Sequence, residues 1–367
     1  MKKGMDRLRI ALGMGLLSSA VLAATRTARA APAPASGNQV VGGVTWFYSN
    51  NTAPNNAAPF GGNCGKRTVD PQGRPLKPEK LGLQPAPNGG SLPGCGFGVT
   101  EASFVTGNIS DAFDGALVLA VNGTVFKNPD ATIDLTGTTV TSDTVNIGGL
   151  GTQVQYFFEP TQKAVRALYS FTNTTGAAIT ANVLIDNNLG SDGSTRIEAT
   201  ADGDTTVEPG DSWVATNDLG APPTRVLGGV DPPLTWIRYQ VGSPVITNAQ
   251  PVIVPAIDDF RESYTLNVPA GQTQRLMVIV KLNSTVAAST AAGPALDTLA
   301  ELGAAGLLAG LDAQQQSQLV NWIAGPVEPV RAVPTMSGWA QLGLMLTLAV
   351  GGLAAVRLGT RPNQRAV

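Results

Sequence analysis

Apolar and polar residues alternate with a period of two along most of the chain between Val99 and Leu282. Such alternation is typical of half-buried β-strands. The runs 261–268 and 274–282 flank the turn residues Pro269-Ala270-Gly271, and this arrangement predicts a hairpin. Because no helical period separates the strands, the sequence favours an antiparallel sandwich over a parallel sheet. Similar runs lie at 115–121, 138–147, 153–158, 164–172, 179–186 and 235–241.

Residues 294–325 differ, since their leucines recur at helical spacing. Gly310 is placed to end a first helix, and Asp312 with Gln315 forms a capping box that starts a second. We expect this helical hairpin to pack on a β-rich domain at 99–293. The predicted fold class is therefore mainly β, an antiparallel β-sandwich-like ectodomain with two short C-terminal helices.

The first thirty residues have the order of a secretory signal peptide. A basic start precedes an apolar run at 10–24, and the small residues Ala28 and Ala30 follow it. The run is too short for a stable membrane span, and the small residues suit a signal peptidase. We expect residues 1–30 to be removed on export, and we exclude them from the fold.

A second apolar stretch, residues 338–356, contains no charged side chain. As a helix it is about 28 Å long, close to the roughly 30 Å hydrocarbon thickness of a bilayer. Three arginines lie in the tail at 357–367, and the positive-inside rule keeps such a tail cytoplasmic. We expect one C-terminal transmembrane helix with the preceding chain exported. A buried core helix is the alternative.

A short motif begins before this stretch and extends into its first residues, after a proline-containing linker. The linker and the first part of the motif occupy 326–337. The residues of the motif are Val333, Pro334, Thr335, Met336, Ser337, Gly338, Trp339 and Ala340. The motif resembles the IPTL-type C-terminal sorting signal (IPTL-CTERM) of Gram-negative bacteria, in which Ile-Pro-Thr-Leu-Ser-x-Trp-Gly precedes a transmembrane helix and a basic tail. Val, Met and Ala replace Ile, Leu and the final Gly here. The resemblance implies processing by an exosortase-like membrane enzyme and delivery of the ectodomain to the cell surface or matrix. An ordinary membrane anchor is the alternative.

Charge and composition exclude several classes of function. Without residues 1–30 the chain has 18 basic and 25 acidic residues, a net charge of −7. Such a chain repels phosphate backbones, so we expect no nucleic-acid partner. The chain also contains no histidine, which excludes Ser-His-Asp and Cys-His catalysis and histidine metal ligands.

Residues 31–98 are rich in Gly, Pro and Asn from Ser49 onward, and we expect this region to be irregular. It contains the two cysteines of the chain, Cys64 and Cys95. Because an oxidising compartment lets them pair, we expect a structural disulfide that contributes roughly 3 to 4 kcal/mol. Two thiolates without other soft ligands make a poor zinc site.

Four aspartates suggest a weak calcium site: Asp186, Asp192, Asp202 and Asp204. Carboxylate-rich and amide-rich loops suit this cation, which takes six to eight oxygen ligands. Their spacing fits no EF-hand, and Asp-Asn-Gly loops are also what hairpin turns select. The sequence favours turns, with calcium as the alternative and no other cofactor.

Signals for carbohydrate chemistry are sparse. Trp46, Trp213 and Trp236 have flat faces that can stack on sugars, although aromatic residues on strands more often belong to the core. The pairs Asp258/Asp259 and Asp202/Asp204 are nominal candidates for glycoside hydrolysis, which uses two carboxylates. Adjacent strand residues point to opposite faces, so the first pair has little support.

The sequence thus predicts an exported cell-surface or extracellular-matrix protein of structural or adhesive type, without catalytic activity. One alternative is a secreted carbohydrate-active hydrolase that uses two carboxylates. Another is a membrane-anchored module that binds a glycan or calcium. The expected partners are an exosortase-like enzyme, the membrane through 338–356 and, in the alternatives, an extracellular glycan.

Overall fold

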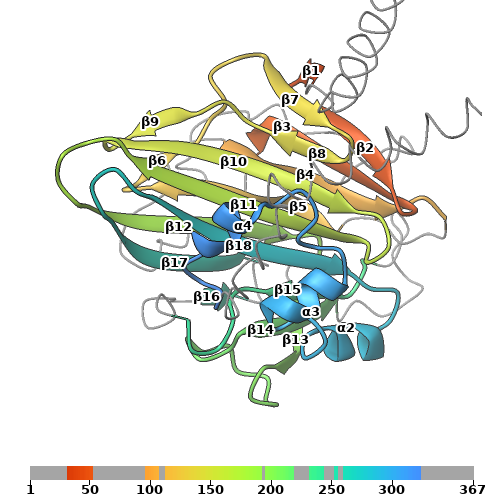
Figure 1. The fold of residues 1–367 in the computed structure, drawn as a ribbon. Helices are drawn as coiled ribbons and strands as arrows, with labels where there is room; N and C mark the ends of the chain where they lie inside the picture. Colours follow the sequence, from red (N-terminus) through yellow and green to blue (C-terminus); the bar gives the residue numbers. More distant parts are fainter. Residues whose placement is uncertain are drawn as a thin grey trace, which may run out of the picture. The chain divides into compact units, whose positions relative to one another are not determined.

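Two antiparallel β-sheets make up most of the computed structural model (Figure 1). The structure describes residues 31–52, 96–106, 112–191, 195–218, 231–243, 252–254 and 259–323. The chain divides into two units between residues 323 and 324, and the described residues all belong to the first.

The larger sheet has ten strands among the described residues, in the order β1-β7-β8-β10-β11-β18-β15-β14-β13, with β9 also on β10. Its strands are β1 (Ala31–Pro34), β7 (Thr132–Thr136), β8 (Thr139–Thr141), β9 (Val145–Ile147), β10 (Leu150–Glu159), β11 (Ala164–Asn173), β13 (Thr195–Thr200), β14 (Trp213–Asp218), β15 (Leu234–Ile237) and β18 (Thr273–Leu282).

The smaller sheet has eight strands among the described residues, in the order β16-β17-β12-β5-β4-β3-β2, with β6 also on β5. Its strands are β2 (Gly37–Val41), β3 (Val44–Thr52), β4 (Gly96–Phe104), β5 (Phe113–Val121), β6 (Thr124–Val125), β12 (Ile179–Leu189), β16 (Val252–Val254) and β17 (Asp259–Val268).

The core lies between the two sheets, because the alternating apolar residues of both face each other. Aromatic pairs join the sheets directly. Trp46 of β3 stacks on Phe158 of β10 with ring centroids 5.4 Å apart, and Trp236 of β15 meets Phe260 of β17 edge-on at 5.1 Å. Contacts of this kind add about 0.5–1.5 kcal/mol each beyond the burial of their area.

Two of the connections that cross between the sheets are neighbouring turns. One turn leads from β11 in the larger sheet to β12 in the smaller, and the other leads from β17 back to β18. Asn173 fastens the two turns together, because its side-chain amide donates to the carbonyls of Ala177 (2.8 Å) and Val268 (2.9 Å). β12 and β17 are consequently neighbours in the smaller sheet, paired over ten residues from Ile179–Val268 to Asn188–Asp259.

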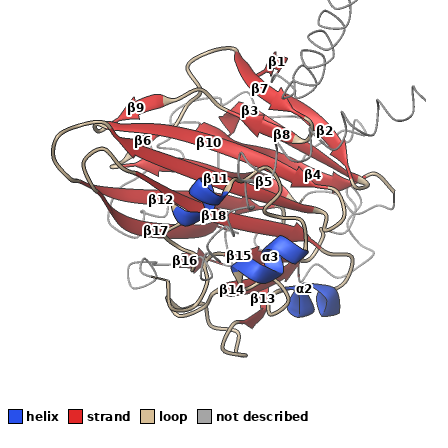
Figure 2. Cartoon of the chain, viewed as in Figure 1, coloured by secondary structure: helices blue, strands red, loops and turns tan. Residues whose placement is uncertain are grey.

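The outer face of the larger sheet carries the segment that follows β18 (Figure 2). The segment contains α2 (Val286–Ala292), α3 (Leu299–Ala304) and α4 (Ala313–Ser317). Arg166 of β11 donates to the carbonyls of Leu307 (2.8 Å) and Ala309 (2.9 Å), and Trp322 donates to the carbonyl of Met277 (2.8 Å). This segment therefore shields the outward residues of β11 and β18 from water.

The predicted mainly β, antiparallel fold is confirmed. The expected strands at 115–121, 153–158, 164–172 and 179–186 lie within β5, β10, β11 and β12, respectively. The predicted run 138–147 forms two short strands, β8 and β9, and the run 235–241 is strand only as far as Ile237.

The hairpin predicted for 261–268 and 274–282 is wrong. β17 pairs with β12 and β16 in the smaller sheet, whereas β18 pairs with β11 and β15 in the larger. The period-two pattern cannot distinguish the two arrangements, since each strand directs one apolar face into the same core in both cases.

Residues 31–52 also differ from the irregular region expected at 31–98, because they form β1, β2 and β3. Gly42 and Gly43 both have positive φ, 61° and 79°, and join β2 to β3 in a tight hairpin. A Val-Gly-Gly-Val sequence is a local signal for such a turn.

The C-terminal helices follow the prediction in part. The capping box of Asp312 and Gln315 is present and starts α4, as expected. The first predicted helix, α3, ends at Ala304 rather than near Gly310, and α2 precedes it without a clear apolar stripe in its sequence.

The predictions for the two ends of the chain and for the disulfide fall outside the described residues. They concern 1–30, Cys64, Cys95, the motif at Val333 to Trp339 and the stretch 338–356. Within the part of the chain that the structure describes, no helix combines the length and apolarity needed to cross a bilayer.

Candidate functional site

A buried ion pair lies on the outer face of the smaller sheet. Asp186 of β12 and Arg261 of β17 are direct partners in the antiparallel register, and Nε of Arg261 donates to Oδ1 of Asp186 at 3.0 Å. Their strand neighbours Ile185 and Phe260 belong to the core, so alternation turns this pair outward. Both side chains are nonetheless almost fully buried, at 1% and 4% exposure.

Burial raises the pKa of Asp186 to about 6, because desolvation penalises the charged carboxylate. The charge and hydrogen bond of Arg261 and the backbone N–H of Asn187 lower the pKa, but not enough to offset desolvation. Among the described residues, Oδ2 of Asp186 has no hydrogen-bond partner, and neither does Oδ1 of nearby Asn188. The carboxyl therefore combines a proton affinity near neutrality with one unsatisfied oxygen.

A second carboxylate on the outward side of this sheet belongs to Glu101 of β4, which is buried between the core residues Val99 and Ala102. Its Oε1 accepts from the backbone N–H groups of Ala102 (2.6 Å) and Ala112 (3.0 Å), and it ties the end of β4 to the start of β5. In the sheet, β5 separates Glu101 from the strand of Asp186. We refer to Asp186, Asn188 and Arg261 as the outer-face cluster, and Glu101 lies outside it.

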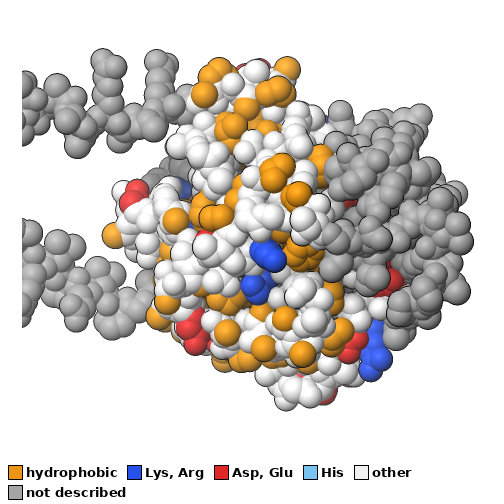
Figure 3. All heavy atoms as spheres, turned by 90° about the vertical axis from the view of Figure 1, so that its right-hand side faces the viewer, with side chains coloured by type: hydrophobic (Ala, Val, Ile, Leu, Met, Phe, Trp, Pro, Cys, Tyr) orange, Lys and Arg blue, Asp and Glu red, His pale blue; other side chains and the backbone are white. Residues whose placement is uncertain are grey.

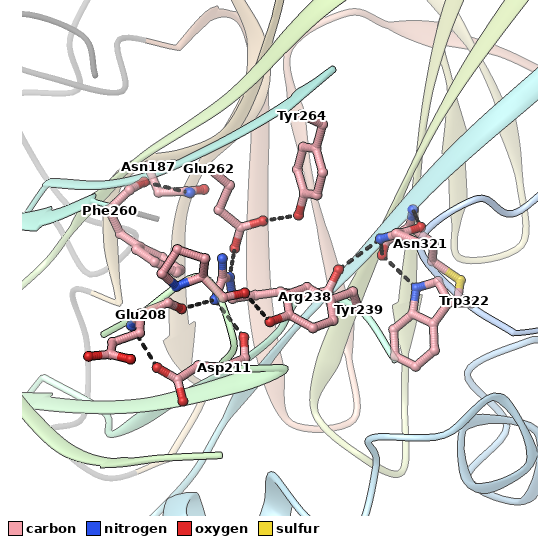
Figure 4. A network of polar contacts seen from close by, with 12 residues as sticks. Asn187, Glu208, Asp211, Arg238, Tyr239, Phe260, Glu262, Tyr264, Asn321 and Trp322 are labelled. Carbon is pink, nitrogen blue, oxygen red and sulfur yellow. Dashed lines mark hydrogen bonds and ion pairs between the residues drawn. The ribbon is translucent and has the colours of Figure 1, made fainter. Parts of the chain in front are cut away.

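A different ion pair lies between the sheets (Figure 4). Nε of Arg238 donates to Oε1 of Glu262 at 3.1 Å, both side chains are completely buried, and the hydroxyl of Tyr264 donates to the other oxygen of Glu262. Burial raises the pKa of Glu262, while Arg238 and Tyr264 lower it.

Arg238 also donates to the backbone carbonyl of Asp211 at 2.6 Å, which attaches the loop before β14 to β17. The guanidinium lies 6.0 Å from the centre of the Phe260 ring, within the apolar core. Because this pair is enclosed by the core, we assign it a structural role and not a site for ligands.

The structure does not bring the predicted calcium residues together. Asp186 lies in the smaller sheet, whereas Asp202 and Asp204 lie in the turn between β13 and β14 of the larger sheet. Asp192 lies outside the described residues. In the described ranges, no group of three or more Asp, Glu, Cys or His side chains is placed to hold a metal ion. Calcium binding stays a prediction.

Asp202 and Asp204 serve as turn residues. The Thr200 hydroxyl donates to Oδ1 of Asp202 at 2.8 Å and lowers the pKa of that carboxyl, and the backbone N–H of Thr206 donates to Oδ1 of Asp204 at 2.7 Å. Such side-chain acceptors are the reason that tight turns select aspartate.

The three tryptophans considered as sugar platforms belong to the interior. Trp46 and Trp236 are fully buried between the sheets, and Trp213 is 7% exposed. Trp213 lies against Gly293, where an added Cβ would come within 2.1 Å of its ring. Asp258 and the side chain of Asp259 lie outside the described part of the chain.

Sequence reasoning found Asp186 but not its partner. In the sequence, Arg261 is only the first residue of the predicted strand 261–268. The usable signal is a pair of opposite charges in two strands, Asp186 and Arg261, each directly after a core residue. On the face shown in Figure 3, charged side chains are sparse, as expected from a chain with 14% charged residues.

No protein-family model matches the sequence, and no curated protein matches it. Solved structures show weak similarity. A polysaccharide lyase is 12% identical with a TM-score of 0.32, covering 51% of this chain and 31% of the lyase. The heparan sulfate lyase HepC from Pedobacter heparinus is 11% identical with a TM-score of 0.32, covering 52% and 30%. A galactose mutarotase-like protein from Lactobacillus casei is 9% identical with a TM-score of 0.30, covering 51% and 94%.

These similarities overturn the prediction that the chain is not an enzyme, since the two lyases and other similar structures are enzymes, and we do not retain it. The matches span about 30% of the length of the two lyases. TM-scores near 0.3 identify neither a reaction nor a substrate for this chain.

The raised pKa of Asp186 predicts a specific dependence of stability on pH. Its folded pKa is about 6, whereas an unfolded aspartate has a pKa of about 3.9. Between these values the folded state binds more protons, so stability decreases as pH rises from about 4 to about 6, by up to ~3 kcal/mol. The free energy of unfolding, measured with urea across this range, should decrease with pH in the wild type. Asp186→Asn should lack this contribution to the decrease.

The exposed Asp202 provides the control for this measurement. Asp202→Asn should keep the decrease between pH 4 and pH 6, because Asp202 is exposed and hydrogen bonds, first that of Thr200, lower the pKa of its carboxyl. Parallel pH profiles for the wild type and Asp186→Asn would contradict the assignment.

Proposed function

We propose that the chain is an exported carbohydrate-active protein in which the Asp186 carboxyl transfers protons to or from a glycan. The observation behind this proposal is the raised pKa of a carboxyl that retains one unsatisfied oxygen. A general acid or base works best when its pKa lies near the working pH. Since the chain has no histidine, a carboxyl with a raised pKa is a natural substitute.

The other residues of the outer-face cluster support a polyhydroxylated ligand. The Asp186 carboxyl and the side-chain amide of Asn188 each retain a buried oxygen without a hydrogen-bond partner among the described residues, and sugar hydroxyls can donate to such acceptors. The net charge of −7 after residue 30 disfavours phosphate-rich ligands. Carbohydrates are also what the neighbours described above act on according to their names, although that similarity lends no weight here.

We also propose that the C-terminal motif sorts this domain to the cell surface or matrix. The support comes from the sequence: Pro334, Thr335, Ser337 and Trp339 stand before an apolar stretch with a basic tail. An exosortase-like enzyme would release the exported domain from its membrane anchor. A surface or matrix protein of structural or adhesive type can use a glycan site to hold or remodel matrix polysaccharide.

The catalytic proposal predicts that Asp186→Asn loses at least about 100-fold in rate on the glycan that the wild type converts, as expected for a general acid–base residue. The measurement is release of reducing ends or unsaturated products from a panel of neutral and acidic polysaccharides. The matched control, Asp202→Asn, should keep wild-type activity. Full activity in Asp186→Asn, or no conversion of any panel member by the wild type, rejects the proposal.

The sorting proposal predicts the end of the mature protein. Mass spectrometry of the protein from its native host should find a C-terminus within Val333 to Ser337, and Trp339→Ala should leave more of the uncut precursor. An intact chain through Val367 in the wild type rejects sorting and leaves only a membrane anchor.

A further inference from the structure

A β-bulge lies directly beneath Asp186. In the pairing of β12 with β5, Asp186 is opposite Val118, and Asn188 is opposite Gly115. The step from one pair to the next is two residues in β12 and three in β5, so β5 contains one extra residue here. The backbone of Leu117, inside the bulge, has φ of +61°, a left-handed conformation that is uncommon for a residue with a side chain. Bulges of this kind redirect side chains and are frequent beside active sites.

Asn187 holds this bulge from the core side. Its Oδ1 accepts from the backbone N–H of Leu117 at 2.7 Å. Its Nδ2 donates to the carbonyl of Phe260 at 2.8 Å (Figure 4). The carbonyl of Leu117 accepts from the hydroxyls of Tyr156 and Tyr169, each at 2.9 Å. Three buried side chains therefore replace the hydrogen bonds that the bulge removes from the sheet, which is how a strained backbone persists.

The same residue connects the bulge to the outer-face cluster. Alternation along β12 turns the Asn187 side chain inward and those of Asp186 and Asn188 outward. The side-chain amide joins β5 to β17, the two strands that flank β12, at the level where Arg261 meets Asp186. The backbone N–H of Asn187 also stabilises the Asp186 carboxylate.

We propose that Asn187 is a positioning residue, whose inward amide locks the bulge of β5 and so keeps Asp186 buried against Arg261. This inference rests on the proposed function of Asp186 as the acid–base group. Among the described residues, the charged group that faces the carboxyl is Arg261, from β17, while β5 presents the apolar Val118 at the paired position. Loosening the bulge admits water without bringing a new charge to the carboxyl.

The test is the titration of the Asp186 carboxyl in the full chain, followed by carbon NMR with labelled aspartate and assigned through Asp186→Asn. Asn187→Leu removes both hydrogen bonds at similar volume. Because desolvation is what raises the pKa, the midpoint should fall from about 6 by about one pH unit or more.

Asn321→Leu is the matched control. Asn321 is also fully buried and also bridges two backbone segments, since it donates to the carbonyls of Arg238 (2.7 Å) and Met277 (2.8 Å), but it lies by the larger sheet. Its replacement should reduce stability and leave the Asp186 midpoint unchanged.

The combined variant Tyr156→Phe and Tyr169→Phe provides a second route if Asn187→Leu does not fold. It removes both donors to the Leu117 carbonyl and should lower the midpoint in the same direction. An unchanged midpoint in whichever of these two bulge variants folds overturns the positioning role, even if Asp186→Asn abolishes activity. A shifted midpoint with full activity in Asp186→Asn instead rejects the proposed function and keeps the positioning role.

Discussion

The contact between the inner faces of the two sheets determines where the charged side chains of β17 can go. β17 shows the consequence in two adjacent residues. Arg261 points away from the core and meets Asp186, while Glu262 points into the core and needs Arg238 and Tyr264 as partners. Unpaired charges at either place would be costly, because both are desolvated. The sandwich thus enforces pairing on both sides of one strand.

The two pairs serve different purposes in our account. In the inner pair, both carboxylate oxygens of Glu262 accept hydrogen bonds from side chains. The outer pair leaves one Asp186 oxygen unsatisfied beside a strained bulge. Buried groups that are incompletely satisfied and backbone strain both concentrate at functional sites. In a chain without histidine, such a carboxyl can carry a proton near neutral pH. Its desolvation lowers the stability of the fold when the carboxyl is charged.

Local pattern predicted the strands well and their partners poorly. The alternation in β5, β10, β11 and β12 was readable because each strand buries one face. The crossing from β17 to β18 could not be predicted from the sequence, because a hairpin and a crossing between sheets expose the same residues. The sequence indicates Asp186 as a candidate oxygen ligand for calcium. Its raised pKa could not be predicted, because it depends on burial by strands that are distant in sequence. The bulge beside Leu117 has one local signal, Gly115, because a glycine inside a strand suggests a bulge; Leu117 itself gives none, since leucine does not favour positive φ.

The most direct test of this account is the neighbour of β17, because its pairing with β12 places Arg261 opposite Asp186. Asn182 of β12 and Thr265 of β17 are register partners on the outer face, with Oγ1 of Thr265 3.3 Å from Oδ1 of Asn182. Cysteines at these two positions, in a chain with Cys64 and Cys95 replaced, should form a disulfide rapidly on mild oxidation of the folded protein. Cysteines at Asn267 and Gln274, which a β17–β18 hairpin would pair, should not. The reverse result, with 267 and 274 linked and 182 and 265 free, would contradict the two-sheet arrangement and the site built on it.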